Sequence, residues 1–209
     1  GKGKGKGATF HMFMAEIDCP PGGNITTRCG LGGWGSQSQV SHAVSAHPAG
    51  PYTRVKNVLG KEHHTPNTKV SPVDGSWNIY SISHADPTNR AAWSIVHAAS
   101  TDQGATFSPG GNGTIITQGF SVPTPILHAN GTMSLFYGAW SDLPAPTSSN
   151  ESIGLMRCGR KDGDCDAGTV PCKQPIVCNA RESRPIFEHS AEGPDIWRDV
   201  RGNYHTLVS

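Results

Sequence analysis

A single outline recurs along this 209-residue chain: a proline, a short apolar segment, a polar turn with a glycine, and a strand that alternates aromatic and aliphatic residues. The copies occupy residues 10–16, 66–82, 125–137 and 191–209, and the first copy contains only the second half of the outline. They are marked by Gly7, Gly75, Gly131 and Gly202. A spacing of roughly 55–70 residues is typical of architectures in which each repeat is one supersecondary unit. The sequence therefore predicts an array of similar units.

Each unit is predicted to contain about four strands. After each aromatic strand comes a second segment in which small and polar residues alternate with apolar ones, at 39–45, 93–100 and 153–157. Strands of period two that are closed by glycine turns are typical of antiparallel hairpins. Glycine (26 residues) and proline (16 residues) are abundant, as expected for many short strands and turns. Four-stranded units repeated around an axis give an all-β fold, the β-propeller, with apolar faces buried between neighbouring blades.

The length of the chain limits how much of a propeller it can form. A propeller closes with about four or more blades. Units of roughly 65 residues leave room for about three blades and a partial one. We therefore expect residues 8–209 to form an incomplete propeller, an open arc truncated at both ends with two unpaired blade edges. Residues 1–7, GKGKGKG, are a low-complexity Gly/Lys tail.

Two features indicate an oxidising compartment. The chain contains four acceptor sequons for N-glycosylation, at Asn24, Asn112, Asn130 and Asn150. It also contains six cysteines, namely Cys19, Cys29, Cys158, Cys165, Cys172 and Cys178. An even number and close clustering favour disulfides, whose connectivity the sequence leaves open. We therefore expect a secreted or lumenal glycoprotein.

Charge and motif content exclude several classes of function. The 17 basic and 16 acidic residues are balanced, whereas nucleic acids and anionic membranes bind basic surfaces. No apolar run approaches the roughly 18 residues of a membrane-spanning helix. The sequence contains neither a nucleophile elbow nor a phosphate-binding glycine loop. We expect no nucleic-acid or membrane partner, and a monomer as the full-length protein.

Two segments resemble metal sites only in part. The last four cysteines are separated by six, six and five residues, whereas zinc ligands usually come in pairs about two to four residues apart. Asp162, Asp164 and Asp166 are spaced as in a calcium loop, but Gly168 stands one position late and Lys173 replaces the bidentate glutamate. We expect no metal or other cofactor, with a calcium ion at this loop as the alternative to a solvated acidic turn.

The last copy of the outline resembles a known family. Its Glu192-Gly-Pro-Asp-Ile-Trp segment, followed by Gly202-Asn-Tyr-His, is similar to the blade-opening signature of the five-bladed glycoside hydrolases of family 43. The segments that begin at His64 and Pro123 look like the first strands of other blades. The resemblance implies a five-bladed parent protein that hydrolyses a polysaccharide or oligosaccharide, as arabinofuranosidases and xylosidases do. It also implies that Glu192 is the general acid.

The chemistry needs a second carboxyl group, and here the chain departs from the family. Glycoside hydrolysis uses one carboxyl group to protonate the leaving oxygen and another to activate water or to attack the sugar. The base aspartate of the family opens the first blade and would precede Gly1. The family's third carboxylate should lie within 120–127, where there is no acid. Asp195 is a candidate substitute, although an odd offset from Glu192 on a strand normally points the other way. A non-catalytic carbohydrate-binding propeller is therefore the alternative.

Further candidate binding residues lie near the blade openings. His63, His64 and Asn67 are placed to hydrogen-bond a sugar, with an ordinary structural role as the alternative for the histidines. Trp34, in a glycine-rich loop, either offers an aromatic face to a sugar ring or packs in the core. Trp140 and Trp197 follow apolar strands, and we expect both to pack between blades.

The segment Ser100–Phe107 supports a propeller in a second way. It resembles the Asp-box of sialidases, with Phe107 in place of the usual tryptophan. In that family the box is a structural hairpin between outer strands. A sialidase also needs an arginine triad, and none of the arginines Arg157, Arg181, Arg184, Arg198 and Arg201 occupies a recurrent blade position. A sialidase-like propeller is the third interpretation.

Overall fold

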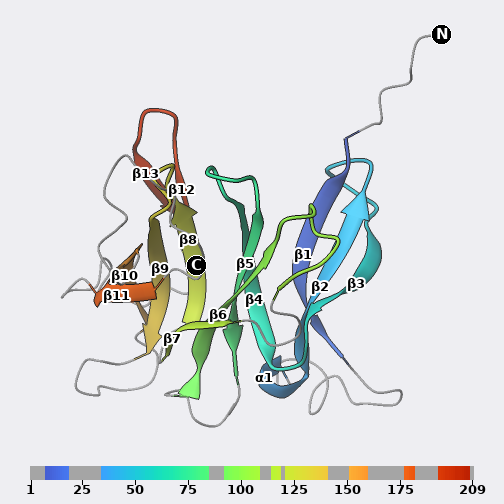
Figure 1. Cartoon of the computed structure of the whole chain (residues 1–209). Coiled ribbons are helices and arrows are strands. Elements are labelled where there is room, and N and C mark those ends of the chain that lie inside the picture. Colours follow the sequence, from blue (N-terminus) through green and yellow to red (C-terminus); the bar gives the residue numbers. More distant parts are fainter. Residues whose placement is uncertain are drawn as a thin grey trace.

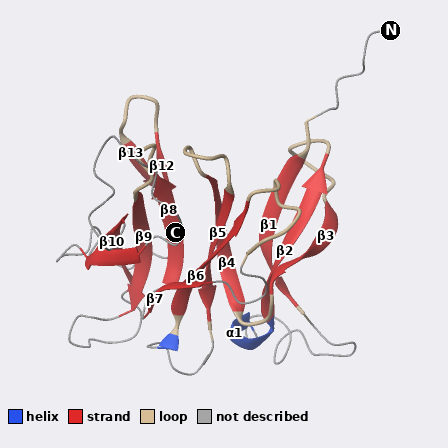
Figure 2. Ribbon diagram, in the orientation of Figure 1, coloured by secondary structure: helices blue, strands red, loops and turns tan. Residues whose placement is uncertain are grey.

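The computed structural model describes residues 8–18, 34–84, 92–108, 114–118, 121–140, 151–159, 177–181 and 193–207. Nearly all of their regular structure is antiparallel β, arranged as successive sheets (Figures 1 and 2). Blade 1 contains β1 (Phe10–Ile17), β2 (Ser38–Ser45) and β3 (Thr53–Leu59), with a one-turn helix, α1 (Trp34–Gln37), before β2. Blade 2 contains β4 (His63–Val70), β5 (Trp77–Ser83), β6 (Ser94–Ser100) and β7 (Thr114–Gln118).

The other two sheets follow the same plan. Blade 3 contains β8 (Ser121–Leu127), β9 (Met133–Trp140), β10 (Glu151–Gly159) and β11 (Val177–Arg181), and blade 4 contains β12 (Asp195–Arg198) and β13 (Tyr204–Leu207). Blades 2 and 3 are four-stranded and pair neighbour to neighbour in chain order. The prediction of an all-β fold with four-stranded antiparallel blades is therefore confirmed. The helix α1 has four residues, and no helix in the described part of the chain is long enough to cross a membrane.

The recurring glycines occupy equivalent turns between the first and second strands of blades 2, 3 and 4. Gly75, Gly131 and Gly202 have φ values of 71°, 83° and 93°, in the left-handed region that glycine adopts without steric cost. The amide of Gly131 donates to the carbonyl of His128, and the amide of Gly202 to that of Asp199, at 2.9 and 3.0 Å. These turns explain why glycine marks the repeat. Gly7 lies outside the described residues.

The hydrophobic core is divided between the blade interfaces. Three clusters join blades 1 and 2, blades 2 and 3, and blades 3 and 4. Successive residues of β5 pack against different neighbouring blades: Ile79 packs with blade 1 and Tyr80 with blade 3. On the next strand Val96 faces blade 1 and Ile95 faces blade 3. Because side chains alternate across a strand, period-two apolar segments buried on both faces produce stacked sheets.

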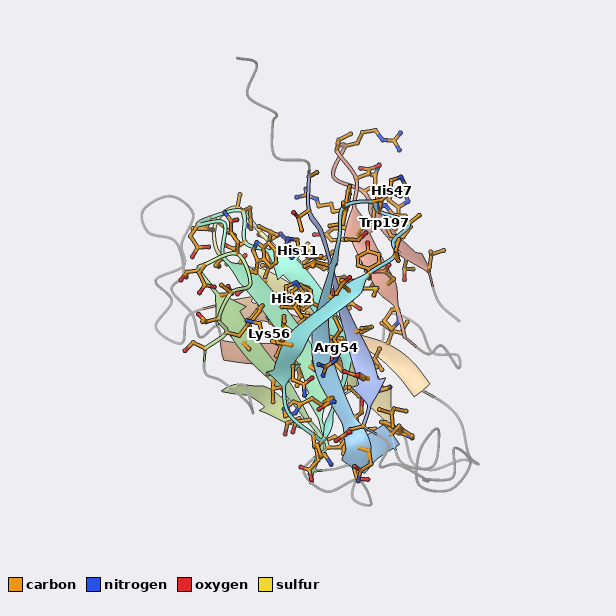
Figure 3. The ribbon with its side chains drawn as sticks, turned by 90° about the vertical axis from the view of Figure 1, so that its right-hand side faces the viewer. His11, His42, His47, Arg54, Lys56 and Trp197 are labelled. Carbon is orange, nitrogen blue, oxygen red and sulfur yellow. The ribbon has the colours of Figure 1, made fainter. Side chains whose placement is uncertain are left out.

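The Asp-box segment forms the hairpin between β6 and β7. The Asp102 carboxylate accepts hydrogen bonds from the Ser100 hydroxyl at 2.7 Å and from the Thr106 amide and hydroxyl at 2.8 and 2.6 Å. These bonds hold the pKa of Asp102 well below its usual value. Phe107 packs against the core between blades 1 and 2 and contacts Phe13, which stacks on His42. His42 also stacks on His11 (Figure 3). The box therefore has a structural role at a blade interface.

Two tryptophans differ from expectation. Trp34 begins the helix α1 rather than lying in a glycine loop. Trp197, predicted to pack between blades, is 44% exposed. It lies on the face of β12 opposite the buried Ile196 and stacks on His205, with ring centroids 5.3 Å apart. The side chain of Trp140 lies outside the described residues.

Candidate active site at the openings of the inner strands

The first strands of blades 2, 3 and 4 open with the same unusual backbone. A residue with positive φ precedes a proline in each: Thr65 (46°), Val122 (44°) and Gly193 (60°). A left-handed conformation is strained for β-branched residues, and residues before proline normally prefer extended conformations. The pairing register shifts at the same place in β4 and β8. Strained backbone of this kind concentrates at functional sites.

This backbone motif corrects the alignment of the repeats. The proline that follows the left-handed residue is Pro66 in blade 2, Pro123 in blade 3 and Pro194 in blade 4. The sequence outline had matched Pro125 to the other two. The bulge before Thr124 shifts the register of the strand. Pro123 and Pro125 therefore both fit the sequence pattern, and only the backbone conformation shows which of them is equivalent to Pro66.

The openings of β8 and β12 lie in contact. The Thr124 hydroxyl donates a hydrogen bond to the carbonyl of Pro194, and Thr124 is buried. A methyl group placed on Gly193 would lie 3.9 Å from Cγ1 of Val122. The inner strand β4 packs beside β8, and α1 contacts β4 at the lower end of the sheets in Figure 1. The first strands of the three blades, β4, β8 and β12, therefore lie next to one another. They form one wall, and all three begin at the same end of it.

The residues directly before the left-handed positions are equivalent in the three blades. They are His64 in blade 2, Ser121 in blade 3 and Glu192 in blade 4. Glu192 itself lies outside the described residues. At the two equivalent positions that are described, the chain has a histidine and a serine in place of a carboxylate.

His63 and His64, adjacent in sequence, have different environments. The His64 Nδ1 atom lies 2.7 Å from the Ser38 hydroxyl, and burial lowers the pKa of His64. Its imidazole is 5.2 Å from the Trp34 ring. His63 is only 2% exposed, and its Nδ1 donates to the carbonyls of Gly60 and Lys61 at 3.0 and 2.9 Å. His64 thus belongs to the opening, whereas these bonds give His63 a role in the β3–β4 turn.

The remaining predicted residues do not join His64 and Trp34. Asn67 lies after the bulge of β4, where it pairs with Tyr80 in the register of the sheet. Asp195 is exposed and shares the face of β12 that carries Trp197, opposite the buried Ile196. The structure therefore brings together Trp34 and His64 from the predicted set.

Two residues that the sequence did not single out complete this cluster. His84 has no exposed surface and lies between the edges of Trp34 and Trp93, with ring centroids 4.6 and 4.5 Å away. Both of its ring nitrogens lack a hydrogen-bond partner among the described residues. Burial, with smaller effects of His64 and His63, lowers the pKa of His84 to about 4. Neither His84 nor Trp93 belongs to the recurring outline, so no sequence signal pointed to them.

An unpaired buried imidazole costs stability and therefore needs an explanation. Within the described ranges no group of three histidine, cysteine, aspartate or glutamate side chains is arranged to hold a metal ion. The cluster of Trp34, His64, His84 and Trp93 instead combines apolar ring faces with neutral imidazole nitrogens. Only Trp34 and His64 are partly exposed, so a ligand with an apolar face and hydroxyl groups at its edges would contact these two, while the buried His84 and Trp93 support them.

The buried histidines predict a loss of stability in mild acid. His97 is 3% exposed and donates from Nε2 to the Asn78 side-chain carbonyl at 2.8 Å, and burial lowers its pKa to about 4. In the unfolded chain a histidine titrates near 6.5. Between these values the unfolded state binds protons that the folded state does not, so stability falls as the pH falls from about 6.5 to 4.

Each pKa unit corresponds to about 1.4 kcal/mol, so His97 alone should contribute a loss of roughly 3 kcal/mol by pH 4. Urea denaturation at pH 7 and pH 4.5 measures this loss. In a His97→Gln variant the difference between the two pH values should shrink, whereas replacing the exposed His47 should leave it unchanged. Equal unfolding free energies of the unmodified protein at both pH values would contradict the assignment.

Known proteins are similar to this chain in structure but not in sequence. No protein-family model matches the sequence, and no curated protein matches it by sequence similarity. Among solved structures, an endo-arabinase from Bacteroides thetaiotaomicron superimposes with a TM-score of 0.56 at 13% identity, covering 84% of this chain and 66% of that one. An endo-1,4-β-xylanase from the same organism gives 0.51 at 15% identity, covering 81% and 57%.

A thermostable family-43 glycoside hydrolase gives a TM-score of 0.56 at 16% identity, covering 94% of this chain and 62% of that one. The chain thus spans between 57% and 66% of the length of these three structures. The stacked antiparallel blades, the equivalent turns and these superpositions agree with one another. The chain has the β-propeller fold of the family-43 glycoside hydrolases.

Proposed function

We propose that the protein is a glycoside hydrolase that acts on a polysaccharide or oligosaccharide, in the manner of arabinofuranosidases and xylosidases. Glu192 is its general acid. The observation that carries the proposal is the repeated left-handed residue and proline at the inner-strand openings. It supports a role for Glu192, because the two residues that follow it, Gly193 and Pro194, match the openings of β4 and β8.

The proposed reaction cleaves the bond between the anomeric carbon and the glycosidic oxygen. The Glu192 carboxyl group donates its proton to that oxygen as the bond breaks, so the leaving sugar departs as a neutral alcohol. A second carboxylate either removes a proton from an attacking water or attacks the anomeric carbon itself. By the resemblance to family 43, we expect this second residue to be an aspartate at the opening of the first blade. Which of the two routes operates depends on the separation of the carboxyl groups.

His64 and Trp34 are proposed to bind the sugar. Because its pKa is lowered by burial, the imidazole of His64 is neutral near pH 7 and its Nδ1 is held by Ser38. A neutral imidazole has one donor and one acceptor nitrogen, so Nε2 remains available to a sugar hydroxyl. His84 packs behind Trp34 and fixes the orientation of its ring. Asn67, His63 and Asp195 stay lesser candidates, because Asn67 lies after the bulge of β4, His63 is held by the carbonyls of the β3–β4 turn and Asp195 is exposed on β12.

A non-catalytic carbohydrate-binding propeller is the second candidate. The observation in its favour is that His64 and Ser121 occupy the positions equivalent to Glu192 in blades 2 and 3. A site with a single carboxyl group binds a sugar but lacks the partner that hydrolysis needs. The two candidates thus differ in whether bound polysaccharide is cleaved.

Secretion is part of the proposal. Asn130 lies exposed in the β8–β9 turn, where a glycan has room to project. In the register of β10 and β11, Cys158 lies opposite Cys178. Directly opposed strand residues have the backbone separation that a disulfide needs. Both features support an oxidising, extracellular compartment.

The test is an assay of the protein against a panel of plant and algal polysaccharides, with reducing ends and binding measured in parallel. We expect new reducing ends from at least one arabinan or xylan. Retention of a polysaccharide in affinity electrophoresis without any release of reducing ends would favour the binding propeller. Absence of both binding and release across the panel would contradict both candidates.

A further inference from the structure

A pocket lies at the other end of the inner strands, away from the openings. It has a volume of about 350 Å³, is open to solvent, and is lined by the last residues of β4, β8 and β12 and by the turns that follow β4 and β8. The volume is at the lower end of the range for small-molecule sites, about 300–1,000 Å³, and suits a ligand the size of a monosaccharide. Trp197, which contributes to this pocket, lies towards the upper end of the molecule in Figure 3.

The wall of the pocket is apolar. Ile126 and Ile196, which are 9% and 4% exposed, contribute to it from blades 3 and 4. Trp197 adds an aromatic side chain that is 44% exposed and is held in place by stacking on His205. Ordered, exposed aromatic rings next to an apolar wall are characteristic of ligand pockets rather than of packed cores.

The polar lining is cationic. Lys69 and Arg198 contribute to the pocket from blades 2 and 4, and among the described residues that line it there is no aspartate or glutamate. Arg198 donates from Nε to the carbonyl of Gly202 at 3.1 Å and lies over the ring of Tyr204. Within the described part of the chain, neither cation forms a salt bridge with a carboxylate. The pocket therefore carries positive charge that the described residues leave uncompensated.

His128 also lines the pocket, and its pKa is affected by the positive charge nearby. Its Nε2 lies 2.9 Å from the Ser134 hydroxyl, and it is half-buried. Burial lowers the pKa of His128, and the nearby charges of Arg198 and Arg157 lower it further. The imidazole is therefore neutral near pH 7 and offers a hydrogen-bonding nitrogen beside the cations.

We propose that this pocket binds an acidic sugar unit, a uronate, with its carboxylate between Lys69 and Arg198 and its ring against the apolar wall. Paired cations favour a carboxylate, since hydrogen bonds between charged groups are roughly twice as strong as neutral ones. The apolar wall distinguishes a sugar ring from an inorganic anion. Identification of the ligand as a sugar rests on the proposed function, whereas the preference for an anion rests on the pocket alone. The pocket lies at the far ends of β4, β8 and β12 from their openings, and it anchors an acidic polysaccharide without taking part in its cleavage.

The test is titration of the protein with galacturonate, galactose and inorganic sulfate, followed by calorimetry or ligand-observed NMR. Galacturonate and galactose differ in the carboxylate at C6, so they isolate the contribution of charge. We expect galacturonate to bind at least tenfold more tightly than galactose or sulfate. The variants Lys69→Gln and Arg198→Gln should each weaken galacturonate binding about tenfold.

Two exposed cations outside the pocket serve as matched controls. Lys61 pairs with Asp18, and Arg201 pairs with Asp199. The variants Lys61→Gln and Arg201→Gln should bind galacturonate as the unmodified protein does. Equal affinities for galacturonate and galactose, binding of sulfate as tight as that of galacturonate, or full binding in the Lys69→Gln/Arg198→Gln double variant would each overturn the proposal.

The result of this binding test can be distinguished from the result of the hydrolysis assay. A Glu192→Gln variant should lose hydrolysis and keep galacturonate binding, because the proposed binding uses Lys69 and Arg198, near the ends of β4 and β12. Conversely, galacturonate could fail to bind while reducing ends are released from a neutral polysaccharide. That result would show that the uronate site is wrong and would not affect the glycosidase proposal.

Discussion

Replacing Glu192 with glutamine should reduce the rate of reducing-sugar release by a hundredfold or more. General acid catalysis by a positioned side chain typically contributes 10²–10⁴-fold to the rate, and an amide cannot supply the proton. Glutamine has nearly the shape of glutamate, so the variant should fold normally. The measurement is kcat on whichever polysaccharide the unmodified protein cleaves, with circular dichroism to verify the fold.

The matched control for this variant is Asp18→Asn. Asp18 is an exposed carboxylate in blade 1 whose side chain pairs with Lys61 at 3.3 Å. Its neutralisation should change kcat by less than about twofold, since isolated surface ion pairs contribute little. A Glu192→Gln variant that keeps more than about a tenth of the activity would remove Glu192 from the role of general acid.

Replacing Gly154 with valine should destabilise the protein by at least about 3 kcal/mol. Gly154 lies in β10 directly opposite Tyr137 of β9, and the ring of Tyr137 covers it. A Cβ atom at this position would lie 2.3 Å from Cζ of Tyr137. Tyr137 is only 1% exposed and is packed in the core between blades 2 and 3, so it has no free space into which to move. Urea denaturation gives the change in unfolding free energy.

The control for the steric argument is Gly75→Ala. A Cβ atom at Gly75 would meet nothing within 4 Å, but its φ of 71° is unfavourable for alanine. This variant therefore isolates the conformational cost, about 1 kcal/mol. If Gly154→Val destabilised the protein no more than Gly75→Ala does, the close packing of Tyr137 on Gly154 would be wrong.

The fold was predictable because the turn residues and the apolar pattern of the strands both indicate stacked antiparallel blades. The turns at Gly75, Gly131 and Gly202 need a left-handed residue, so glycine recurs at a spacing that can be read directly. Strands such as β5 bury both faces, Ile79 against one blade and Tyr80 against the next, which predicts stacked sheets rather than a two-layer sandwich. The Asp-box was recognisable because its hydrogen bonds are made within a single hairpin, by side chains close in sequence.

The site was only partly predictable, since it depends on contacts between distant residues. Trp34 and His84 meet across blades 1 and 2, and nothing in the sequence near His84 distinguishes it from an ordinary strand end. Pro123 and Pro125 alternate on one strand, and only the bulge at Val122 shows which of them corresponds to Pro66. Trp197 follows an apolar residue, but the face it occupies depends on the register of β12 with β13.

The role of Glu192 as proton donor is tested by comparing the effect of Glu192→Gln on substrates with different leaving groups. A general acid matters when the leaving oxygen needs a proton, as in a polysaccharide, and matters little when it does not, as in a 2,4-dinitrophenyl glycoside. We expect Glu192→Gln to reduce the rate at least about a hundredfold on the polysaccharide and less than about tenfold on the dinitrophenyl glycoside of the same sugar. Equal losses on both substrates would show that Glu192 acts in binding or folding, and would contradict its assignment as the proton donor.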